Sequence, residues 1–372
     1  MNNKKRIAII IFLLILIPFF SVQSKKQDIW RDRSDEIKMR ASNFNQNIIS
    51  FLSSRGNSWL IGNQNNLYYI NKQETINLTD ELKNNKLQNI RKITTDGETW
   101  LILGDTSIWN KSPDLLYRFN GVQWYDVSFL LKEIDFDSLQ DFKGTRGTWY
   151  FISKNTVFVW NETSHDIQKI NFPDYIKKHI NYSTRIKFYK VNKGWILTLE
   201  KKNELNTLIR QHDCYDKYFY YLYNEKFIDI TKDFYNIDNN SIIGTNGQEI
   251  LIFGLAFSSS KEYPKFYALV SNGEQTKNIT KKIKYKFNLK APLTQMPFFN
   301  QGKIIWTGSD WVILDGMKNF FWLNSKTWQI KFKKTRDTFL NAGYGGLNSI
   351  LLSGFRSNDF IKPLLVEVDF ND

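Results

Sequence analysis

Residues 96–104 read DGETWLILG, and residues 115–128, after a short insertion, read LLYRFNGVQWYDVS. In the first stretch an apolar strand follows a turn at Gly97. In the second, two strand-like segments flank Asn120-Gly121, a pair that indicates a tight hairpin because both central positions of such a turn favour a positive φ. With a further strand before Gly97, these stretches predict a unit of four short antiparallel strands.

The first stretch recurs along the whole chain. Each copy has a Gly followed closely by Trp or Ile and then by an apolar strand, and successive copies lie about 40 to 60 residues apart, a period typical of propeller blades. The seven copies are GNSWLIG (56–62), GETWLILG (97–104), GTWYFIS (147–153), GWILTL (194–199), GQEILIFG (247–254), GSDWVIL (308–314) and GLNSILLSG (346–354).

The second stretch recurs as well, and four of its copies end in Asp or Asn, an aliphatic residue and a hydroxyl residue. These endings are NLT (77–79), DVS (126–128), DIT (229–231) and NIT (278–280). Every period therefore holds four strands. The sequence predicts an all-β chain in which residues 25–372 form a single seven-bladed β-propeller of four-stranded antiparallel blades.

The two ends of the chain fit together. After Ile350 the sequence offers a second strand and a third, LLVEVDF (364–370), but no fourth. Near the N-terminus WRDRS (30–34) is similar to WYDVS (124–128), with Arg33 at the aliphatic position. We predict that this N-terminal strand closes the last blade and leaves no open sheet edge at the seam. The alternative is a six-bladed ring with a separate N-terminal segment, because the seventh copy is the least regular.

Five copies carry a tryptophan at the same position after the glycine. A large aromatic residue at one repeat position is expected where neighbouring sheets pack against each other, so we interpret these residues as structural. They are Trp59, Trp100, Trp149, Trp195 and Trp311.

These motifs resemble known propeller repeats. DGETWLILG followed by LYRFNGVQW is similar to the Kelch repeat, and GNSWLIG is similar to the sensor propellers of bacterial two-component regulators. Kelch blades end their second strand with Gly-Gly, whereas a single glycine stands here, as at Gly62 and Gly104. TTDGETW (94–100) resembles the aspartate box of sialidase-type propellers, which is a structural turn.

The N-terminus has the pattern of a secretory signal peptide. Lys4, Lys5 and Arg6 precede an apolar run over residues 7–20, and Val22 and Ser24 fit a small-residue cleavage site. The run is shorter than the about 20 residues that span a bilayer. We therefore expect residues 1–24 to be a signal peptide and the protein to be secreted or held at the cell surface. An uncleaved N-terminal membrane anchor is the alternative.

The charge balance is strongly basic, with 51 Lys plus Arg against 37 Asp plus Glu, a formal net charge of +14. The basic residues are scattered and form no arginine-rich stripe, so we expect no nucleic-acid partner. Attraction to anionic envelope polymers is a second use for the charge. The single cysteine, Cys214, excludes an intramolecular disulfide and a multi-thiolate zinc site.

Residues with catalytic or metal-binding chemistry are sparse. His165, His179 and His212 fall in different loops and none has a second histidine at ligand spacing, so we expect no metal and no cofactor. Glu133, Asp135, Asp137 and Asp141 follow the second blade, and paired carboxylates are what glycoside hydrolysis requires.

Loop lengths indicate where a ligand binds. In a four-stranded blade, the connections between the second and third strands and between blades share one face, and here they hold the long insertions. Binding residues concentrate in long loops on rigid scaffolds. The contact residues that we predict on this face are Trp109, Arg210, His212, Tyr215 and Tyr263.

The sequence thus favours an exported, monomeric, non-catalytic propeller that acts as a binding module for a protein or glycan at the cell surface. The alternative is a carbohydrate-active enzyme with its carboxylates on the long-loop face.

Overall fold

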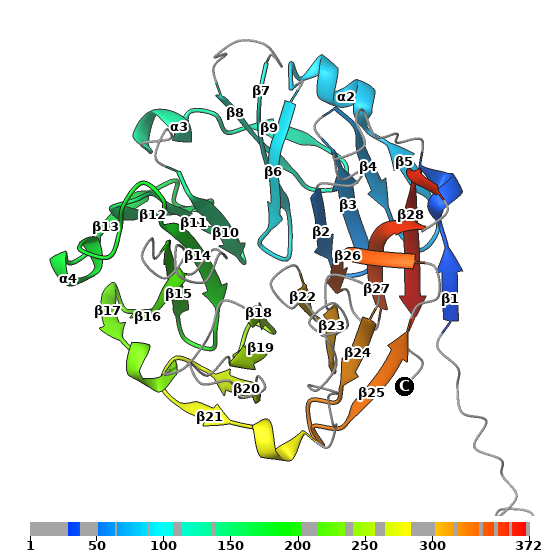
Figure 1. Cartoon of the computed structure of the whole chain (residues 1–372). Helices are drawn as coiled ribbons and strands as arrows, with labels where there is room; N and C mark the ends of the chain where they lie inside the picture. Colours follow the sequence, from blue (N-terminus) through cyan, green and yellow to red (C-terminus); the bar gives the residue numbers. More distant parts are fainter. Residues whose placement is uncertain are drawn as a thin grey trace, which may run out of the picture.

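The chain forms a ring of seven sheets. The computed structural model describes residues 29–37, 51–63, 65–87, 89–106, 114–134, 139–202, 215–234, 241–256, 265–283, 302–314, 319–334, 338–345, 349–356 and 359–369. Their strands form seven four-stranded antiparallel sheets, which surround a central axis (Figure 1). The predicted seven-bladed β-propeller is confirmed, and the six-bladed alternative is wrong.

Each of blades 1 to 6 uses four consecutive strands, the first of them innermost, whereas blade 7 takes its outer strand from the N-terminus. The strands are, in blade 1, β2 (Phe51–Arg55), β3 (Ser58–Gly62), β4 (Leu67–Ile70) and β5 (Thr75–Asn77); in blade 2, β6 (Asn89–Thr95), β7 (Trp100–Asp105), β8 (Asp114–Phe119) and β9 (Trp124–Asp126); in blade 3, β10 (Asp141–Thr145), β11 (Thr148–Ile152), β12 (Thr156–Asn161) and β13 (Ile167–Asn171); in blade 4, β14 (Arg185–Lys190), β15 (Trp195–Lys202), β16 (Tyr215–Tyr223) and β17 (Lys226–Asp229); in blade 5, β18 (Ser241–Thr245), β19 (Ile250–Ala256), β20 (Lys265–Ser271) and β21 (Thr276–Asn278); in blade 6, β22 (Lys303–Trp306), β23 (Trp311–Leu314), β24 (Asn319–Leu323) and β25 (Ile330–Lys334); and in blade 7, β26 (Thr338–Gly345), β27 (Ser349–Arg356), β28 (Asp359–Asp369) and β1 (Ile29–Asp32).

Short helices follow the outer strands and lead the chain onward. They are η1 (Ser34–Glu36), α2 (Thr79–Asn84), α3 (Leu130–Glu133), α4 (Asp174–Lys177), η3 (Thr231–Phe234) and η4 (Thr280–Lys282). Within the described part of the chain, no helix has the length and apolar character needed to cross a membrane.

The Asp/Asn–aliphatic–hydroxyl motif ends the outer strand by bonding to the strand beside it. In blade 2, the amide of Ser128 donates to the carboxylate of Asp126 at 2.8 Å, and the Ser128 hydroxyl accepts from the amide of Leu116 at 3.0 Å. Val127 between them is buried, and its amide donates to the Leu116 carbonyl at 2.9 Å. The hydroxyl thus continues the hydrogen-bonding ladder where the strand stops. Thr79, Thr231 and Thr280 accept equivalent amide bonds in blades 1, 4 and 5.

Strand β1 repeats this arrangement at the seam. It pairs antiparallel with β28, from Ile29 opposite Asp369 to Asp32 opposite Val366, and the blue and red ends of the chain lie side by side in Figure 1. The Ser34 amide donates to Asp32 at 2.9 Å, and the Ser34 hydroxyl accepts from the Leu365 amide at 2.9 Å. The predicted closure of the last blade by an N-terminal strand is confirmed.

The hairpin at Asn120-Gly121 is present, but the predicted turn conformation is wrong in one respect. Gly121 has a φ of +98°, whereas Asn120 stays outside the positive-φ region. The Asn120 side chain instead accepts the amides of Val122 and Gln123 at 2.9 and 2.8 Å. Asn272 and Gly273 repeat this pattern. Asparagine is favoured here because its side chain caps the turn.

The repeated tryptophans lie at equivalent places in the second strands of their blades. All five are buried, with exposed fractions between 0% and 4%. Trp100 of blade 2 contacts Tyr69 of blade 1 edge-on, with ring centroids 5.8 Å apart, and lies within 6.0 Å of Phe119 in its own blade. Trp195 of blade 4 likewise packs on Tyr150 of blade 3 at 4.6 Å. The structure therefore places these side chains between neighbouring blades.

Candidate functional site

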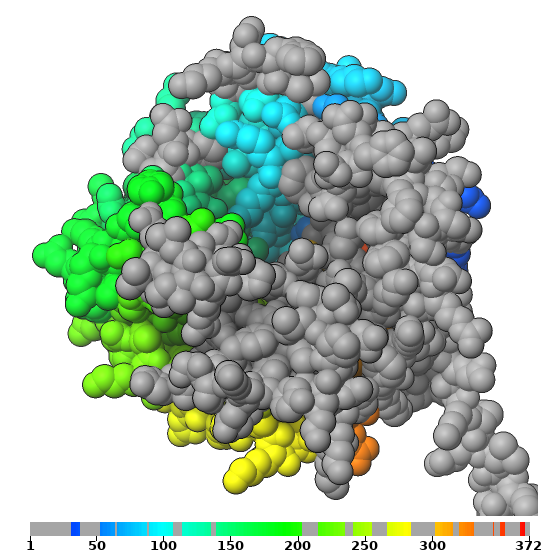
Figure 2. Space-filling model, viewed as in Figure 1, coloured from blue at the N-terminus to red at the C-terminus, as the bar shows by residue number. Residues whose placement is uncertain are grey.

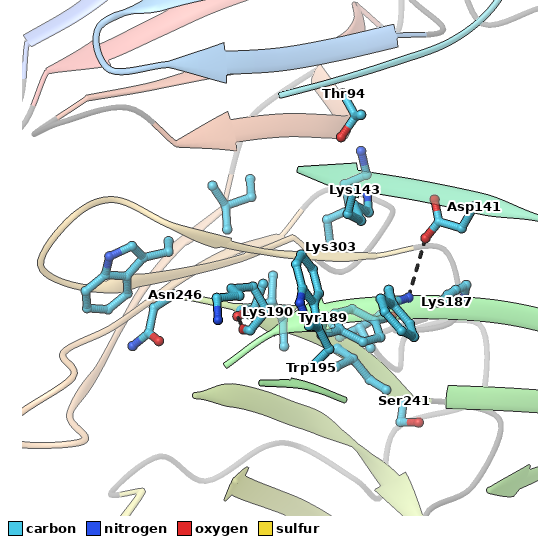
Figure 3. A pocket seen from close by; sticks show the side chains of 18 of the residues that line it. Thr94, Asp141, Lys143, Lys187, Tyr189, Lys190, Trp195, Ser241, Asn246 and Lys303 are labelled. Carbon is cyan, nitrogen blue, oxygen red and sulfur yellow. Dashed lines mark hydrogen bonds between the residues drawn. The ribbon is translucent and has the colours of Figure 1, made fainter. Parts of the chain in front are cut away.

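A cavity of about 810 Å³ lies along the axis of the ring. Its wall is built from the inner strands β6, β10, β14, β18, β22 and β26, joined by residues of β15 and β16. Figure 3 shows side chains from several blades that point into this space. In the space-filling view, described residues of blades 2 to 5 are seen in cyan, green and yellow from the top to the bottom of the left side (Figure 2).

The two ends of the cavity differ in their residues. The inner strands of blades 3 to 6 begin at Asp141, Arg185, Ser241 and Lys303, all of which line the cavity. We call this the loop end, because the connections between blades and between second and third strands meet there. The opposite end, where the inner strands turn into the second strands, is lined by Thr95, Lys190, Thr245 and Trp306.

Of the predicted contact residues, the structure describes only Tyr215. It begins β16 and lines the loop end of the cavity, on the face that the loop lengths indicated. The guanidinium of Arg185 lies over its ring, 5.1 Å from the centroid. Trp109, Arg210, His212 and Tyr263 lie outside the described residues, so their role stays a prediction.

The cavity wall has a surplus of positive charge. Arg185 and Lys187 remain exposed because they alternate along β14 with Ile186 and Phe188, which are buried in the apolar core. Among the residues that the structure describes, six basic and two acidic side chains line the cavity, a surplus of four positive charges when every group is ionised. The basic residues are Lys143, Arg185, Lys187, Lys190, Lys217 and Lys303, and the acidic ones are Asp141 and Glu200. Because the charges line a concave wall, they attract anions into it.

Both carboxylates in the wall are held by lysines. Glu200 contacts the ammonium groups of Lys187 at 3.2 Å and Lys217 at 3.8 Å. Lys217 also donates to the Ser241 hydroxyl at 2.8 Å, which ties blade 4 to blade 5.

Asp141, at the start of β10, is buried and forms an ion pair with Lys92 of the neighbouring inner strand. Its second oxygen accepts the Phe188 amide of β14 at 3.4 Å (Figure 3). Burial opposes ionisation of this carboxyl group, but the positive charges of Lys143 and Lys92 outweigh it and hold the pKa below 3.8. Asp141 therefore links the inner strands of blades 2, 3 and 4 as a carboxylate.

Asp141→Asn is expected to cost about 2 kcal/mol of unfolding free energy at neutral pH, because it leaves Lys92 without its buried counter-charge. Folding lowers the pKa of Asp141, so this contribution is complete above the ordinary value of 3.8 and is lost as the pH falls through the lower folded-state value. Urea unfolding of both proteins from pH 7 to pH 3 tests this. The difference between them should shrink below about pH 4; a difference that stays constant down to the lowest pH contradicts the assignment.

Lys303 begins β22 and lines the loop end of the cavity. Its side chain is exposed, although it lies inside the ring, and no described carboxylate forms an ion pair with it. Loss of hydration of its ammonium group inside the ring and the nearby positive charge of Lys143 lower the pKa of Lys303. Lys143 and Lys303 belong to blades 3 and 6, so the ring brings like charges together from distant parts of the chain.

Aromatic rings and neutral polar groups share the wall with these cations. The aromatic residues are Phe188, Tyr189, Trp195, Tyr215 and Trp306, of which Phe188 and Trp195 are buried in the core, and the polar groups include Thr94, Ser241, Thr245 and Asn246. Burial raises the pKa of Tyr189 far above its usual range, so its hydroxyl stays protonated. The cavity can therefore offer charge, hydrogen bonds and apolar ring surface to one ligand.

The histidines and most of the carboxylates singled out in the sequence are not placed in the cavity by the structure. His165 lies in a turn of blade 3, and His179 stacks on Tyr218 with centroids 3.8 Å apart. The described residues contain no group of three His, Cys, Asp or Glu side chains able to hold a metal ion. Glu133 ends α3, while Asp135 and Asp137 lie outside the described residues. Only Asp141 of that carboxylate group is placed in the cavity.

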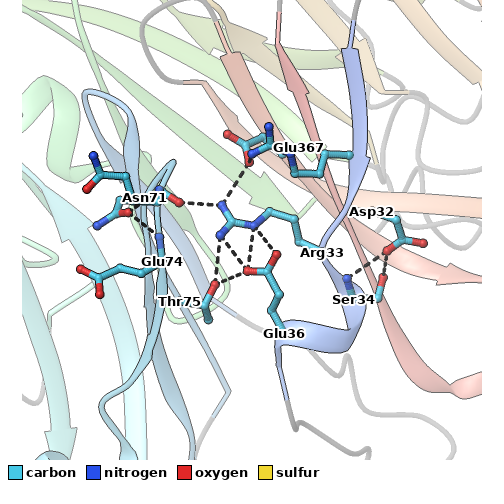
Figure 4. A network of polar contacts seen from close by, with 10 residues as sticks. Asp32, Arg33, Ser34, Glu36, Asn71, Glu74, Thr75 and Glu367 are labelled. Carbon is cyan, nitrogen blue, oxygen red and sulfur yellow. Dashed lines mark hydrogen bonds and ion pairs between the residues drawn. The ribbon is translucent and has the colours of Figure 1, made fainter.

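A second charged cluster lies at the seam, away from the cavity (Figure 4). Arg33 is 3% exposed and occupies the position that is aliphatic in the other copies of the motif. Its guanidinium contacts Glu367 at 3.0 Å, Glu36 at 2.7 Å and the Asn71 carbonyl of blade 1 at 2.7 Å. The cluster thus joins the N-terminal strand, blade 7 and blade 1, which is a structural role.

The aspartate-box phrase is also structural. Asp96 accepts the amides of Glu98 and Thr99 within its own turn, at 2.9 and 2.7 Å. Its other oxygen accepts the Gly147 amide of blade 3 at 2.6 Å. The carboxylate is therefore used in joining two blades.

Comparisons with known proteins find matches among solved structures only. A scan of protein-family models and a search of curated proteins find no match. Among solved structures, PorZ of Porphyromonas gingivalis, a bacterial surface component of the type-IX secretion system, has a TM-score of 0.49 and 9% identity over 88% of this chain. The chain spans 38% of the length of that protein.

Two further solved structures are propeller-sized chains from other contexts. The Pan2 WD40 domain of Neurospora crassa has a TM-score of 0.45 and 8% identity, covering 87% of this chain and 89% of that one. A chain of the mitotic checkpoint complex has a TM-score of 0.49 and 10% identity, covering 92% and 91%. With identities of 8 to 10%, these matches assign no function to this chain.

Proposed function

We propose that this protein is an exported, non-catalytic binding module that recognises a protein or glycan at the cell surface through the loop end of its axial cavity. The observation that carries the proposal is the surplus of basic side chains in that cavity. A closed ring of strands keeps these groups in place, and binding residues concentrate where long connections join a rigid scaffold. We also propose that the blades are Kelch-like repeats, on the similarity of DGETWLILG and LYRFNGVQW to the Kelch motif.

The environment of Asp141 favours binding over the glycoside hydrolase alternative. A general acid of a glycosidase needs a raised pKa so that it is protonated near neutral pH. Asp141 instead has a lowered pKa because of Lys143 and Lys92. Glu200 lies between Lys187 and Lys217. Both carboxylates of the wall are therefore placed as counter-ions of lysines.

Capture from envelope extracts tests the binding site. Arg185→Glu combined with Lys303→Glu, here R185E/K303E, reverses two exposed charges of the loop end that form no ion pair with a described residue. K226E/K232E makes the same change in net charge at two exposed residues that do not line the cavity. We expect the wild type and K226E/K232E to retain the same partner and R185E/K303E to lose it. Equal retention by all three proteins contradicts the proposed site.

Export is tested separately. When the full chain is expressed with a C-terminal tag in a bacterial host, it should be recovered from the envelope or the medium with Lys25 as its first residue. If the chain is instead recovered in the membrane fraction and still carries residues 1–24, the result supports the N-terminal anchor.

A further inference from the structure

The outer strand of blade 7 is followed by a charged residue where four equivalent strands are followed by an aliphatic one. Arg33 stands at the position that Leu78, Val127, Ile230 and Ile279 occupy in blades 1, 2, 4 and 5. Those four side chains are buried, with exposed fractions of 2% to 7%, and Arg33 is as deeply buried at 3%. One repeat position therefore holds a guanidinium in blade 7 and an apolar side chain in four other blades.

The third strand of blade 7 is charged at the matching position. Glu367 of β28 is fully buried, and the Arg33 guanidinium contacts its carboxylate at 3.0 Å (Figure 4). The strand registers place Val270 at the equivalent position of blade 5, and Val270 is also buried. In blade 7 a charge thus meets a charge, whereas in blade 5 an apolar side chain meets another.

Pairing between the wrong strands would therefore separate a buried charge from its partner. An apolar outer strand on β28 would take the closest cation away from Glu367. The N-terminal strand on an apolar blade would bury Arg33 with the exposed Glu36 as its nearest carboxylate. Breaking a buried ion pair is far more costly than the small net stability that the intact pair provides. The pair is thus suited to discriminate between strands.

We propose that the edge of β28 and the adjoining hairpin of blade 1 form a strand-binding site, which selects an extended peptide that has an arginine at the position of Arg33. In the folded chain the site is filled by residues 29–37. It lies away from the axial cavity, and the inference does not depend on the proposed function.

The contacts of this segment combine backbone pairing with side-chain recognition. Beyond the strand itself, the Arg33 amide donates to the Leu365 carbonyl at 2.8 Å, and the Ser34 hydroxyl accepts the Leu365 amide at 2.9 Å. The Arg33 guanidinium also donates to the Asn71 carbonyl of blade 1 at 2.7 Å. Ile37 is buried in a cluster with side chains of both blades. When a strand is added to a sheet edge, backbone bonds provide affinity and side-chain contacts provide selectivity.

Binding of free peptides to the full-length chain tests the selection. One probe is a fluorescent peptide of residues 28–38, and the other is the same peptide with Arg33→Leu. In the wild-type chain the tethered strand competes at a high effective concentration, so we expect neither peptide to bind. In the full-length Arg33→Leu chain the tethered strand no longer matches Glu367. There the wild-type peptide should bind about tenfold or more tightly than the Arg33→Leu peptide, as measured by fluorescence anisotropy.

The Glu367→Val chain is the matched control. In that chain the order of affinities should reverse, with the Arg33→Leu peptide bound several-fold more tightly than the wild-type peptide. A general attraction between peptide and ring cannot produce this reversal. If the Arg33→Leu chain shows no cooperative unfolding in urea, Arg33→Lys replaces it, because lysine keeps the charge but lacks the forked donors that contact Glu367, Glu36 and Asn71 together.

Equal binding of the two peptides to the Arg33→Leu chain overturns the inference, and so does an unchanged order of affinities in the Glu367→Val chain. Absence of binding by both peptides to both variants also overturns it. None of these results bears on the capture experiment with R185E/K303E, which tests the proposed function at the axial cavity.

Discussion

Arg33→Leu is expected to lower the free energy of unfolding by about 3 kcal/mol, because it leaves the buried carboxylate of Glu367 without its closest cation. Glu367 is fully buried, and Arg31, at 3.7 Å, is a more distant and half-exposed partner. Glu36 and Thr75 would also lose the guanidinium that holds them. Urea unfolding measured by tryptophan fluorescence gives the size of the loss.

The control for Arg33→Leu is a double variant that copies the residues found at the same repeat positions in another blade. In blade 5 the corresponding positions are Ile279 and Val270, both buried, so Arg33→Leu with Glu367→Val copies an apolar pair that the chain already uses. Replacing a buried ion pair by packed apolar residues is often neutral or stabilising. The double variant should therefore recover most of the lost stability. A double variant as unstable as Arg33→Leu alone would show that the charged pair is not what the seam depends on.

Trp100→Ala is expected to cost about 3 to 5 kcal/mol. The indole is fully buried and lies between Tyr69 of blade 1 and Phe119 of blade 2, and Arg55 of blade 1 lies over its ring at 5.7 Å. Its removal leaves a cavity between two blades. Thermal and urea unfolding both measure the loss.

Val122→Ala is the matched control in the same blade, since Val122 is 82% exposed. A change within about 0.5 kcal/mol is expected there. If Trp100→Ala leaves the unfolding midpoint as unchanged as Val122→Ala does, the repeated tryptophan position does not hold the blades together.

The fold could be predicted from the sequence because short local motifs mark the strands of each blade. The glycine turn and the following apolar strand mark the second strand, and the Asp126-Val127-Ser128 type of ending marks the fourth. The similarity of residues 30–34 to residues 124–128 was enough to predict the closure, even though Arg33 departs from the pattern. The conformation of Asn120 was predicted wrongly because two uses of asparagine, a positive φ and side-chain capping, favour the same residue.

The charged residues that line the cavity could not be predicted from local motifs. Lys143, Arg185 and Lys303 lie in inner strands, which carry the weakest repeat signal, and they meet only because the ring brings three blades to one axis. Asp141 was grouped with the acidic residues before it, whereas its partner, Lys92, is in the preceding blade. Aligning the residues before each glycine turn would have shown lysines at this part of several blades. Their charge surplus is a property of the closed ring.

Binding of the partner at the loop end of the axial cavity can be measured directly. Replacing Arg185 by a photo-reactive amino acid, and Lys226 in a second protein, allows this to be measured by cross-linking to envelope extract followed by mass spectrometry. A cross-linked partner is expected at position 185 and none at position 226. The same partner joined at position 226, with none at position 185, would contradict it.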